Sequence, residues 1–496
     1  MTLNPTVPAA PLRRISLLIL LSVWSLLLLA TPVFAEPADE DKPFLHSLFT
    51  DHIVLQRGVK IPVWGWTQPG ATVTVTLKKK KASAVAGADG KWMVKLPSFS
   101  AGGPYELIVS GPTNATVHDV MIGDVWICSG QSNMEMGIKM VNNATQEIAR
   151  ANNPNIRLFT VPHHIAYRPV ETVKSGWLVC SPESVARGGW GGFSAVAYFF
   201  GRELEQDLNV PIGLIHTSWG GTEAEAWTSA EKLAELPDFV SAVEKVRLVD
   251  PQRVTNTSPH VVTVLYNGMI APLLPYAIWG VIWYQGESNA SRARQYQTLL
   301  PAMIQDWRSR FEAGKFPFLI VQLANYKAKK PEPAESDWAA LREAQSIAAK
   351  RAGNSALALA IDIGDARDIH PKNKQEVGRR LALAARAVAY DERVVFSGPV
   401  FRSAFVAGKN IKIKFDHVDG GLTTAADQRL AGFAVAGEDK KFVWADAVIK
   451  GKTVIVSSAS VEHPMFVRYD WADNPSGNLY NKAGLPAEPF RVSSPR

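Results

Sequence analysis

Ser132 lies in a short segment whose residue types could support nucleophilic catalysis. The segment "SGQSNM" (residues 129–134) follows the apolar run Val125–Cys128. Glycine lets the backbone turn sharply, and a serine at such a turn can present its hydroxyl oxygen and its own N–H to a substrate carbonyl. A helix N-cap uses the same residue types, so Ser132 is a candidate nucleophile only if a base and hydrogen-bond donors accompany it.

Two later segments supply such donors. Gly220 and Gly221 lie in "HTSWGGTEAEAW", and their backbone N–H groups are free to point into an oxyanion hole. The segment "WYQGESNA" brings Gln285, Glu287 and Asn289 to the end of another apolar run, where either amide could donate to an oxyanion. Polar groups buried at a strand end need partners or a function. Gln285 and Asn289 are therefore alternative side-chain donors.

His370 is the candidate general base. It lies in "DIGDARDIHPKNK", after an apolar run and a short acidic loop. An imidazole that takes a serine proton needs its other ring nitrogen held by an acceptor, and Asp368 and Asp365 are both close in sequence. The chain contains no G-x-S-x-G, H-E-x-x-H, P-loop or G-x-G-x-x-G motif. The sequence therefore gives no support to the common α/β-hydrolase, metalloprotease, NTPase or dinucleotide-binding classes.

The candidate residues follow apolar runs that are typical of buried strands. Five runs are nearly continuous, as expected of strands covered on both faces: "DVWICS", "IGLIHTS", "AIWGVIWYQ", "FPFLIVQL" and "SALALAIDIG". Between them lie amphipathic helical patterns, including "SAVAYFFGRELEQDL" and "RQYQTLLPAMIQDWRSRF". This alternation predicts a parallel α/β sheet, whose ligand site lies beyond the carboxyl ends of the strands.

The length of 496 residues favours several domains. Short alternating runs such as "IPVWGW" and "ATVTVTL" predict an N-terminal β-sandwich over residues 36–112. The α/β domain is expected over residues 113–390. Alternating runs then return and predict a C-terminal β-rich domain, again a sandwich module, over residues 391–496.

Residues 1–35 are typical of a signal peptide. Arg13 and Arg14 precede the apolar run 15–30, and Ala35 supplies the small residue before a cleavage site. An uncleaved membrane anchor is the alternative. We expect an exported protein, periplasmic or secreted, whose mature chain has no membrane span. The net charge of +7 is mild for this length, and the basic run Lys78–Lys81 is typical of a hairpin tip or an exposed strand, so we expect no nucleic-acid partner. The sequence does not indicate the oligomeric state.

The four segments resemble the SGNH hydrolase superfamily, and specifically its sialate O-acetylesterase (SASA-type) family. The resemblance rests on "GDVWICSGQSNMEM", "TSWGGTEAEAW", "WYQGESNA" and "DIHPKNKQEVGRRLALAA". It implies a flavodoxin-like three-layer α/β/α domain that removes acetyl groups from carbohydrates by a serine mechanism, with no metal or other cofactor. Ser132 would be the nucleophile and His370 the base. The oxyanion hole would combine the N–H groups of Ser132 and of Gly220 or Gly221 with the side chain of Gln285 or Asn289.

The chain departs from the superfamily pattern at two places, which concern the acid that supports His370 and the side-chain oxyanion donor. The usual acid lies three residues before the histidine, where this chain has Arg367, so the acid is Asp368 or Asp365, and we favour Asp368. In the third segment, residues 286–289 (Gly-Glu-Ser-Asn) replace Gly-x-Asn-Asp, which leaves both Gln285 and Asn289 open as donors.

The expected substrate is an O-acetylated sialic acid. Substrate contacts are expected from the polar side chains that flank the site and from two tryptophans whose rings could stack on a sugar: Gln131, Asn133, Glu287, Trp219 and Trp227. One alternative is an acetylesterase that acts on plant polysaccharides such as xylan or pectin. Another is a non-catalytic carbohydrate-binding protein, which the full set of Ser132, His370 and an adjacent acid disfavours.

Overall fold

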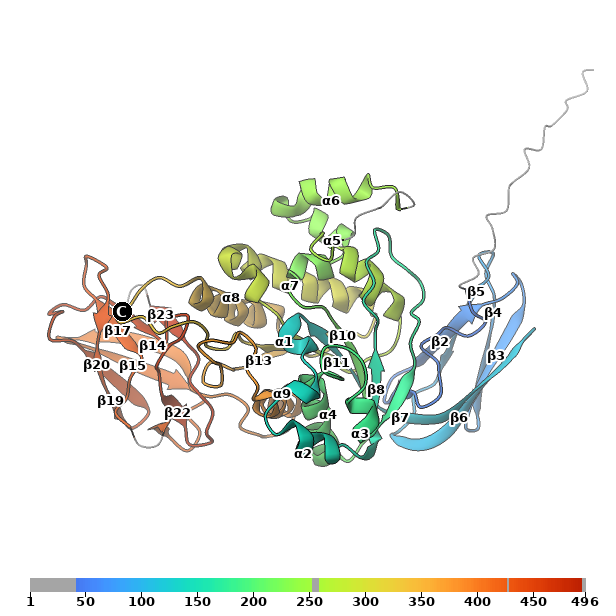
Figure 1. Ribbon diagram of the computed structural model, residues 1–496, viewed down its shortest axis with the longest axis horizontal. Helices are drawn as coiled ribbons and strands as arrows, with labels where there is room; N and C mark the ends of the chain where they lie inside the picture. Colours follow the sequence, from blue (N-terminus) through green and yellow to red (C-terminus); the bar gives the residue numbers. More distant parts are fainter. Residues whose placement is uncertain (1–41, 252–257, 426–427, 493–496) are drawn as a thin grey trace, which may run out of the picture. The chain divides into compact units, whose positions relative to one another are not determined.

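A computed structural model describes residues 42–251, 258–425 and 428–492 (Figure 1). The predicted signal peptide, residues 1–35, lies outside the described residues. Among the described helices, none is long and apolar enough to cross a membrane.

The fold is mixed α/β, with a central sheet that carries the predicted site. The sheet order is β13 (Ser355–Ala358), β12 (Phe318–Val321), β11 (Gly280–Tyr284), β7 (Asn114–Gly130), β10 (Ile212–Ser218), β8 (Asn153–Thr160) and β9 (Trp177–Cys180). Neighbouring strands are parallel except β8 and β9. All five predicted apolar runs form strands of this sheet, so the predicted parallel core is confirmed.

The long strand β7 belongs to two parts of the molecule. Its first half pairs with β6 (Gly102–Ser110) and β1 (Val54–Gln56), and its second half pairs with β10 and β11. The remaining N-terminal strands are β2 (Ile61–Trp66), β3 (Thr72–Leu77), β4 (Lys80–Val85) and β5 (Lys91–Leu96), with β2 paired to β5 and β3 paired to β4 and β6. The predicted domain boundary at residue 113 therefore lies at the start of β7, a strand that pairs with strands of both regions. The N-terminal sandwich stays a prediction.

Two hydrophobic cores lie on opposite faces of the central sheet. Alternate residues of a strand point to opposite faces, so Val125 and Ile127 join one core while Trp126 and Cys128 join the other. The first core contains residues of α7 (Ala293–Arg310) and α8 (Asp337–Ala352), and the second contains residues of α4 (Ala195–Leu208) and α9 (Lys374–Val388). Burial on both faces explains why the strands are continuously apolar.

Short helices lie mainly in the connections. They are α1 (Ser132–Glu135), η1 (Ile138–Met140), α2 (Ala144–Ala149), α3 (Pro182–Val185), η2 (Ala224–Trp227), α5 (Ala230–Ala234), η3 (Pro237–Phe239), α6 (Val240–Arg247), η5 (Tyr266–Ile270), η6 (Ala271–Leu273) and η7 (Glu287–Arg292). Three of them, α1, η2 and η7, carry residues of the predicted site. The site thus lies on the turns that leave the central strands.

The C-terminal region is β-rich, as predicted. One sheet has the order β14 (Val400–Ala407), β15 (Asn410–Asp416), β20 (Thr453–Ser457), β19 (Asp446–Lys450), and a second has β18 (Val443–Trp444), β17 (Phe433–Ala436), β21 (Phe466–Tyr469), β23 (Phe490–Val492). A further pair joins β16 (Leu422–Thr424) to β22 (Leu479–Asn481). These strands share one core, and their arrangement as a sandwich stays a prediction.

Candidate active site

Ser132 begins α1 directly after the end of β7. Gly130 has a φ of +143°, and a Cβ at this position would collide with the carbonyl oxygen of Tyr284 on the neighbouring strand β11. Only glycine fits this close approach, which turns the chain out of the sheet. Ser132 occupies the first turn of α1, and within the described part of the chain its N–H has no hydrogen-bond partner. The local sequence therefore presents both the hydroxyl and the N–H of Ser132.

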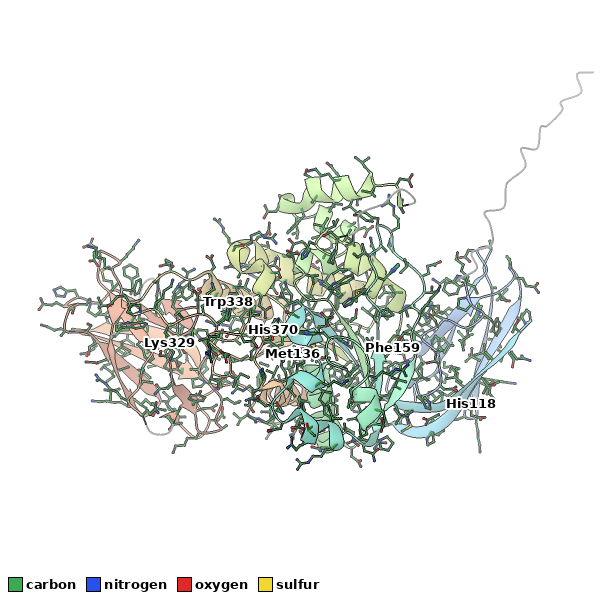
Figure 2. All side chains as sticks on the ribbon, in the orientation of Figure 1. His118, Met136, Phe159, Lys329, Trp338 and His370 are labelled. Carbon is green, nitrogen blue, oxygen red and sulfur yellow. The ribbon has the colours of Figure 1, made fainter. Side chains whose placement is uncertain are left out.

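His370, which is labelled in Figure 2, lies beside the Ser132 hydroxyl, and Asp368 lies beside the other ring nitrogen of His370. The distance between Ser132 Oγ and His370 Nε2 is 3.0 Å. On the other side of the ring, His370 Nδ1 lies 3.3 Å from Asp368 Oδ1, and this carboxylate oxygen also accepts the backbone N–H of His370 at 2.9 Å. The second acid, Asp365, instead accepts the backbone N–H of Arg367 at 2.8 Å. The structure thus brings Ser132, His370 and Asp368 together and leaves Asp365 outside this arrangement.

The environment of His370 favours the neutral imidazole. Burial lowers the pKa of His370 below its usual 6.5, while the nearby Asp368 carboxylate opposes this shift and Lys374 adds to it. The Trp190 ring packs edge-on against the imidazole, with 4.9 Å between the ring centroids. A neutral imidazole can accept the serine proton, so the histidine is ready to act as a base at neutral pH.

We expect kcat/KM for an aryl acetate to fall as the pH decreases through an apparent pKa below 6.5. The imidazolium cannot accept a proton, so activity is present above the pKa of His370 and is lost below it. The Asp368→Asn variant should move this acid limb to still lower pH, because it removes the charge that raises the pKa. An acid limb that stays unchanged in Asp368→Asn would contradict this assignment.

The two predicted backbone donors differ in their hydrogen bonding. Gly220 lies beside Ser132, since a Cβ on Gly220 would lie 3.3 Å from Ser132 Cβ. Its N–H, however, donates to Glu135 Oε2 at 2.6 Å. Gly221 has a φ of +79°, and its N–H has no partner within the ranges that the structure describes. Gly221 is therefore the one of the two with a free amide.

The amides of Gln285 and Asn289 are already engaged. Gln285 Nε2 donates to Thr222 O at 3.2 Å and to Asn289 Oδ1 at 2.6 Å. Asn289 Nδ2 donates to Glu225 Oε2 at 3.0 Å, and both amide side chains are buried. These bonds tie η7 to the segment that follows β10. The oxyanion role of either amide stays a prediction.

The side-chain amide of Gln131 is engaged through its oxygen and not through its nitrogen. Its Oε1 accepts the backbone N–H groups of Gly286 and Ser288, each at 3.3 Å. No partner is found for its Nε2 among the described residues. The Gln131 side chain is therefore held by its oxygen, and its Nε2 is a candidate donor on the residue that precedes Ser132.

A buried polar network joins the Ser132 segment to the His370 segment. Asn133 Nδ2 donates to Glu287 Oε1 at 2.6 Å and to Ile369 O at 3.0 Å. Asn133 Oδ1 accepts from Lys374 Nζ at 2.5 Å. Burial lowers the pKa of Lys374 to about 7 and raises the pKa of Glu287. Asn133 is fully buried, so the structure places it behind the site and not, as predicted, against a substrate.

The Asn133→Leu variant should lower the free energy of unfolding by at least about 3 kcal/mol. Leucine has a similar size but leaves Lys374 Nζ, Glu287 and Ile369 O without these hydrogen bonds. Denaturant titration measures the effect. The control is Asn142→Leu, at an exposed position on the same segment, which should change stability by less than about 0.5 kcal/mol. Equal stability of the two variants would show that the network contributes nothing.

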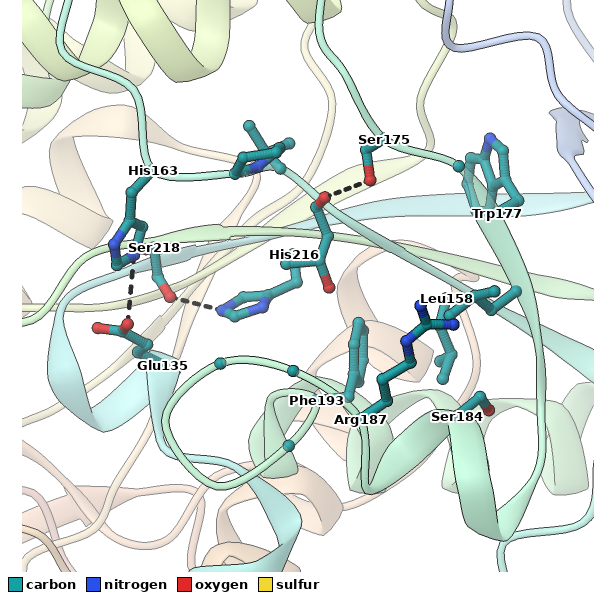
Figure 3. A pocket seen from close by; sticks show the side chains of 18 residues that line it. Glu135, Leu158, His163, Ser175, Trp177, Ser184, Arg187, Phe193, His216 and Ser218 are labelled. Atoms are coloured by element: carbon teal, nitrogen blue, oxygen red, sulfur yellow. Dashed lines mark hydrogen bonds and ion pairs between the residues drawn. The ribbon is translucent and has the colours of Figure 1, made fainter.

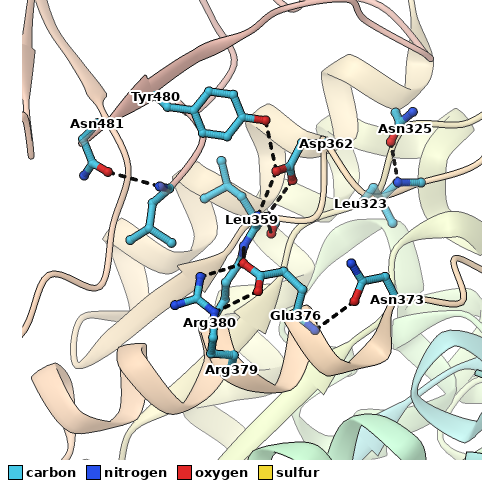
Figure 4. Close-up of polar contacts among 12 residues, drawn as sticks. Leu323, Asn325, Leu359, Asp362, Asn373, Glu376, Arg379, Arg380, Tyr480 and Asn481 are labelled. Carbon is cyan, nitrogen blue, oxygen red and sulfur yellow. Dashed lines mark hydrogen bonds and ion pairs between the residues drawn. The ribbon is translucent and has the colours of Figure 1, made fainter. Parts of the chain in front are cut away.

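Side chains of α9, of the segment after β12 and of the C-terminal region hold residues 359–364, which precede the loop that carries His370 (Figure 4). Arg380 is buried, donates to Leu359 O at 2.6 Å and pairs with both carboxylate oxygens of Asp362 at 2.6 and 2.8 Å. Tyr480 on β22 donates to the same carboxylate at 3.2 Å, and Asn325 accepts the N–H of Gly364 at 2.6 Å. The C-terminal region therefore takes part in positioning the base.

The two predicted sugar-stacking tryptophans lie in different environments. Trp227 is fully buried, packs against Trp283 and donates its indole N–H to Thr222 Oγ1 at 2.9 Å. It cannot stack on a substrate, so that prediction is corrected. Trp219 is partly exposed and its ring stacks on His163, with 4.0 Å between centroids and an interplanar angle of 6°.

A cavity of about 560 Å³ opens beside α1 (Figure 3). Glu135 and His163 line it, with 3.2 Å between Glu135 Oε1 and His163 Nε2. Glu135 was not predicted from the sequence, although its position three residues after Ser132 on a helix could have indicated it. Trp190 was missed as a neighbour of His370, because nothing in the sequence links positions so far apart.

Comparison with known proteins places the chain in a class and a family. Residues 122–387 match the family described as "Carbohydrate esterase, sialic acid-specific acetylesterase". The chain is 37% identical to the sialate O-acetylesterase of Homo sapiens over 389 residues, which cover 72% of this chain and 73% of the human protein. It is 33% identical to the sialate O-acetylesterase of Mus musculus over 507 residues, which cover 90% of this chain and 93% of the mouse protein.

A solved structure agrees with these matches. The crystal structure of a carbohydrate acetylesterase from Xanthomonas citri is 41% identical, with a TM-score of 0.83, and covers 91% of this chain and 99% of that protein. The mixed α/β fold and the site therefore define a carboxylic ester hydrolase. More specifically, the chain belongs to the sialic acid-specific acetylesterase family of carbohydrate esterases.

Proposed function

We propose that this esterase removes O-acetyl groups from sialic acids by two-step acyl transfer. Ser132 attacks the acetyl carbonyl, and His370 takes the serine proton and returns it to the leaving sugar hydroxyl. Water then attacks the acetyl-enzyme, with His370 again as base, and acetate leaves. The observation that carries the proposal is the 3.0 Å distance between Ser132 Oγ and His370 Nε2, with Asp368 Oδ1 3.3 Å from His370 Nδ1.

The oxyanion of the tetrahedral intermediate needs donors that are free in the resting enzyme. The N–H of Ser132 and the Nε2 of Gln131 meet this condition, and the N–H of Gly221 is a third candidate. The N–H of Gly220 would have to leave Glu135 first. Each oxyanion donor contributes about 3–4 kcal/mol to the lowering of the barrier.

The proposed scaffold is a flavodoxin-like three-layer α/β/α domain of the SGNH type over residues 113–390. Support comes from the two cores, since α7 and α8 contribute to one and α4 and α9 to the other. We also propose export through the signal peptide of residues 1–35, on the sequence pattern alone. N-terminal sequencing of the exported protein should then find Glu36 as the first residue.

The sialic acid substrate is supported by the description of the family and by the names of the mammalian relatives. The Xanthomonas citri protein is named only as a carbohydrate acetylesterase, so xylan or pectin acetyl groups are the substrates to compare. The test measures acetate released from O-acetylated N-acetylneuraminic acid and from acetylated xylan at equal acetyl concentration. We expect the larger kcat/KM on the sialic acid. Faster release from xylan would assign the enzyme to plant polysaccharides.

A further inference from the structure

The cavity beside α1 is larger than an acetyl group needs. It is lined by side chains of β8, β9, β10 and α1 and by the glycine-rich loop that follows α3. Apolar side chains form much of its wall, and these include Leu158, Val161, Trp177, Leu178 and Phe193. A cavity with apolar walls and a few polar groups is typical of a site for a small organic ligand.

The charged groups of the cavity are compensated, with one exception. The Glu135 carboxylate is engaged by the N–H of Gly220 and by His163, at 2.6 and 3.2 Å. Burial lowers the pKa of His216 to about 4, so this imidazole is neutral at neutral pH. Arg187 is exposed and its guanidinium has no hydrogen-bond or ionic partner in the described part of the chain. Arg187 thus brings an uncompensated positive charge to the cavity.

The cavity lies next to the catalytic residues, although neither Ser132 nor His370 lines it. Glu135 lies one helical turn after Ser132, and its carboxylate accepts the N–H of Gly220. Gly220 in turn lies beside Ser132 in space. The loop that follows Arg187 also carries Trp190, which packs against His370. Figure 3 shows Glu135 and His163 at one end of the cavity and Arg187 toward the other. Contacts through Glu135 and through the loop of Trp190 therefore link the cavity that Arg187 lines to the catalytic residues.

We infer that Arg187 is a specificity-determining residue that binds the carboxylate of an acidic sugar in this cavity. The inference rests on the proposed function, because sialic acids carry such a carboxylate and the sugars of xylan's acetylated backbone do not. A guanidinium matches a carboxylate with two parallel hydrogen bonds, and a neutral sugar offers no equivalent partner. Arg187 acts on substrate choice and takes no part in the acyl-transfer chemistry.

The test measures inhibition of aryl acetate hydrolysis by N-acetylneuraminic acid and by its methyl ester, whose carboxylate is blocked. Compared with the wild type, Arg187→Gln should raise the inhibition constant of the acid at least about tenfold and leave that of the ester unchanged. Arg187→Lys should be intermediate, since lysine keeps the charge and loses the bidentate geometry. The control is Arg150→Gln, an exposed arginine at the end of α2 outside the cavity, which should match the wild type.

Two outcomes separate the inference from the proposed function. The role of Arg187 would be overturned if the acid inhibited wild type and Arg187→Gln equally. It would also be overturned if Arg187→Gln raised the inhibition constants of the acid and of the ester by the same factor. If the acid inhibits through Arg187 but acetate is not released from O-acetylated N-acetylneuraminic acid, the cavity binds an acidic sugar and the proposed substrate is wrong. Unchanged kcat/KM for the aryl acetate in Arg187→Gln shows that the variant is folded and catalytically intact.

Discussion

Replacing Ser132 by alanine is expected to lower kcat for an aryl acetate by about six orders of magnitude. The variant loses the oxygen that forms the acetyl-enzyme, and His370 keeps no nucleophile at 3.0 Å. The oxyanion donors remain, so a residual rate above the uncatalysed reaction is expected. Steady-state hydrolysis with the purified variant measures the loss, and circular dichroism checks the fold.

A matched control is Ser129→Ala in the same segment. Ser129 is also a serine near the end of β7, is fully buried, and has a hydroxyl without a hydrogen-bond partner in the described structure. Its replacement removes no interaction that the mechanism uses, so activity near that of the wild type is expected. If Ser132→Ala behaved like Ser129→Ala, Ser132 would not be the nucleophile.

The second large effect is expected for Asp368→Asn, which should lower kcat by about 10³- to 10⁴-fold. The asparagine keeps the size of the side chain but no longer stabilises the imidazolium that forms when His370 takes the proton. Its amide could also present an N–H to His370 Nδ1 and so favour the wrong tautomer. Because the Asp368 side chain is 46% exposed, water can replace part of its effect, which places the loss at the lower end of this range.

Asp365→Asn provides the comparison, because this acid is also close to His370 in sequence. It accepts the backbone N–H of Arg367 and makes no contact with the imidazole in the described structure. A loss of less than about fivefold is expected, since a surface hydrogen bond contributes little. A larger loss for Asp365→Asn than for Asp368→Asn would reverse the assignment of the acid.

The strands of the central sheet were predictable where both of their faces are buried. Five runs are continuously apolar because helices cover both faces of the sheet, and all five form strands. The pair β8 and β9 was not predicted. β8 contains Pro154 and the polar Arg157, and β9 has only four residues, so neither shows a clear period. Strands of this kind depend on tertiary pairing more than on their own sequence.

The sequence predicted which segments form the site, but not all of the contacts between them. Ser132, His370 and Asp368 could be identified because each stands in a distinctive local context, and the structure brings them together. The partners of Gln285 and Asn289 could not be identified, because each amide has several candidate partners that only the fold brings close. The same reason applies to the buried network around Asn133 and Lys374, whose members lie 241 residues apart.

The role of Ser132 is tested by labelling the enzyme with a fluorophosphonate, which forms a stable adduct with an activated serine. The modified peptide is then mapped by mass spectrometry. We expect one adduct, on Ser132, no adduct in Ser132→Ala, and much slower labelling in His370→Ala. Labelling of another residue, or inhibition that leaves Ser132 unmodified, would contradict the assignment of Ser132 as the nucleophile.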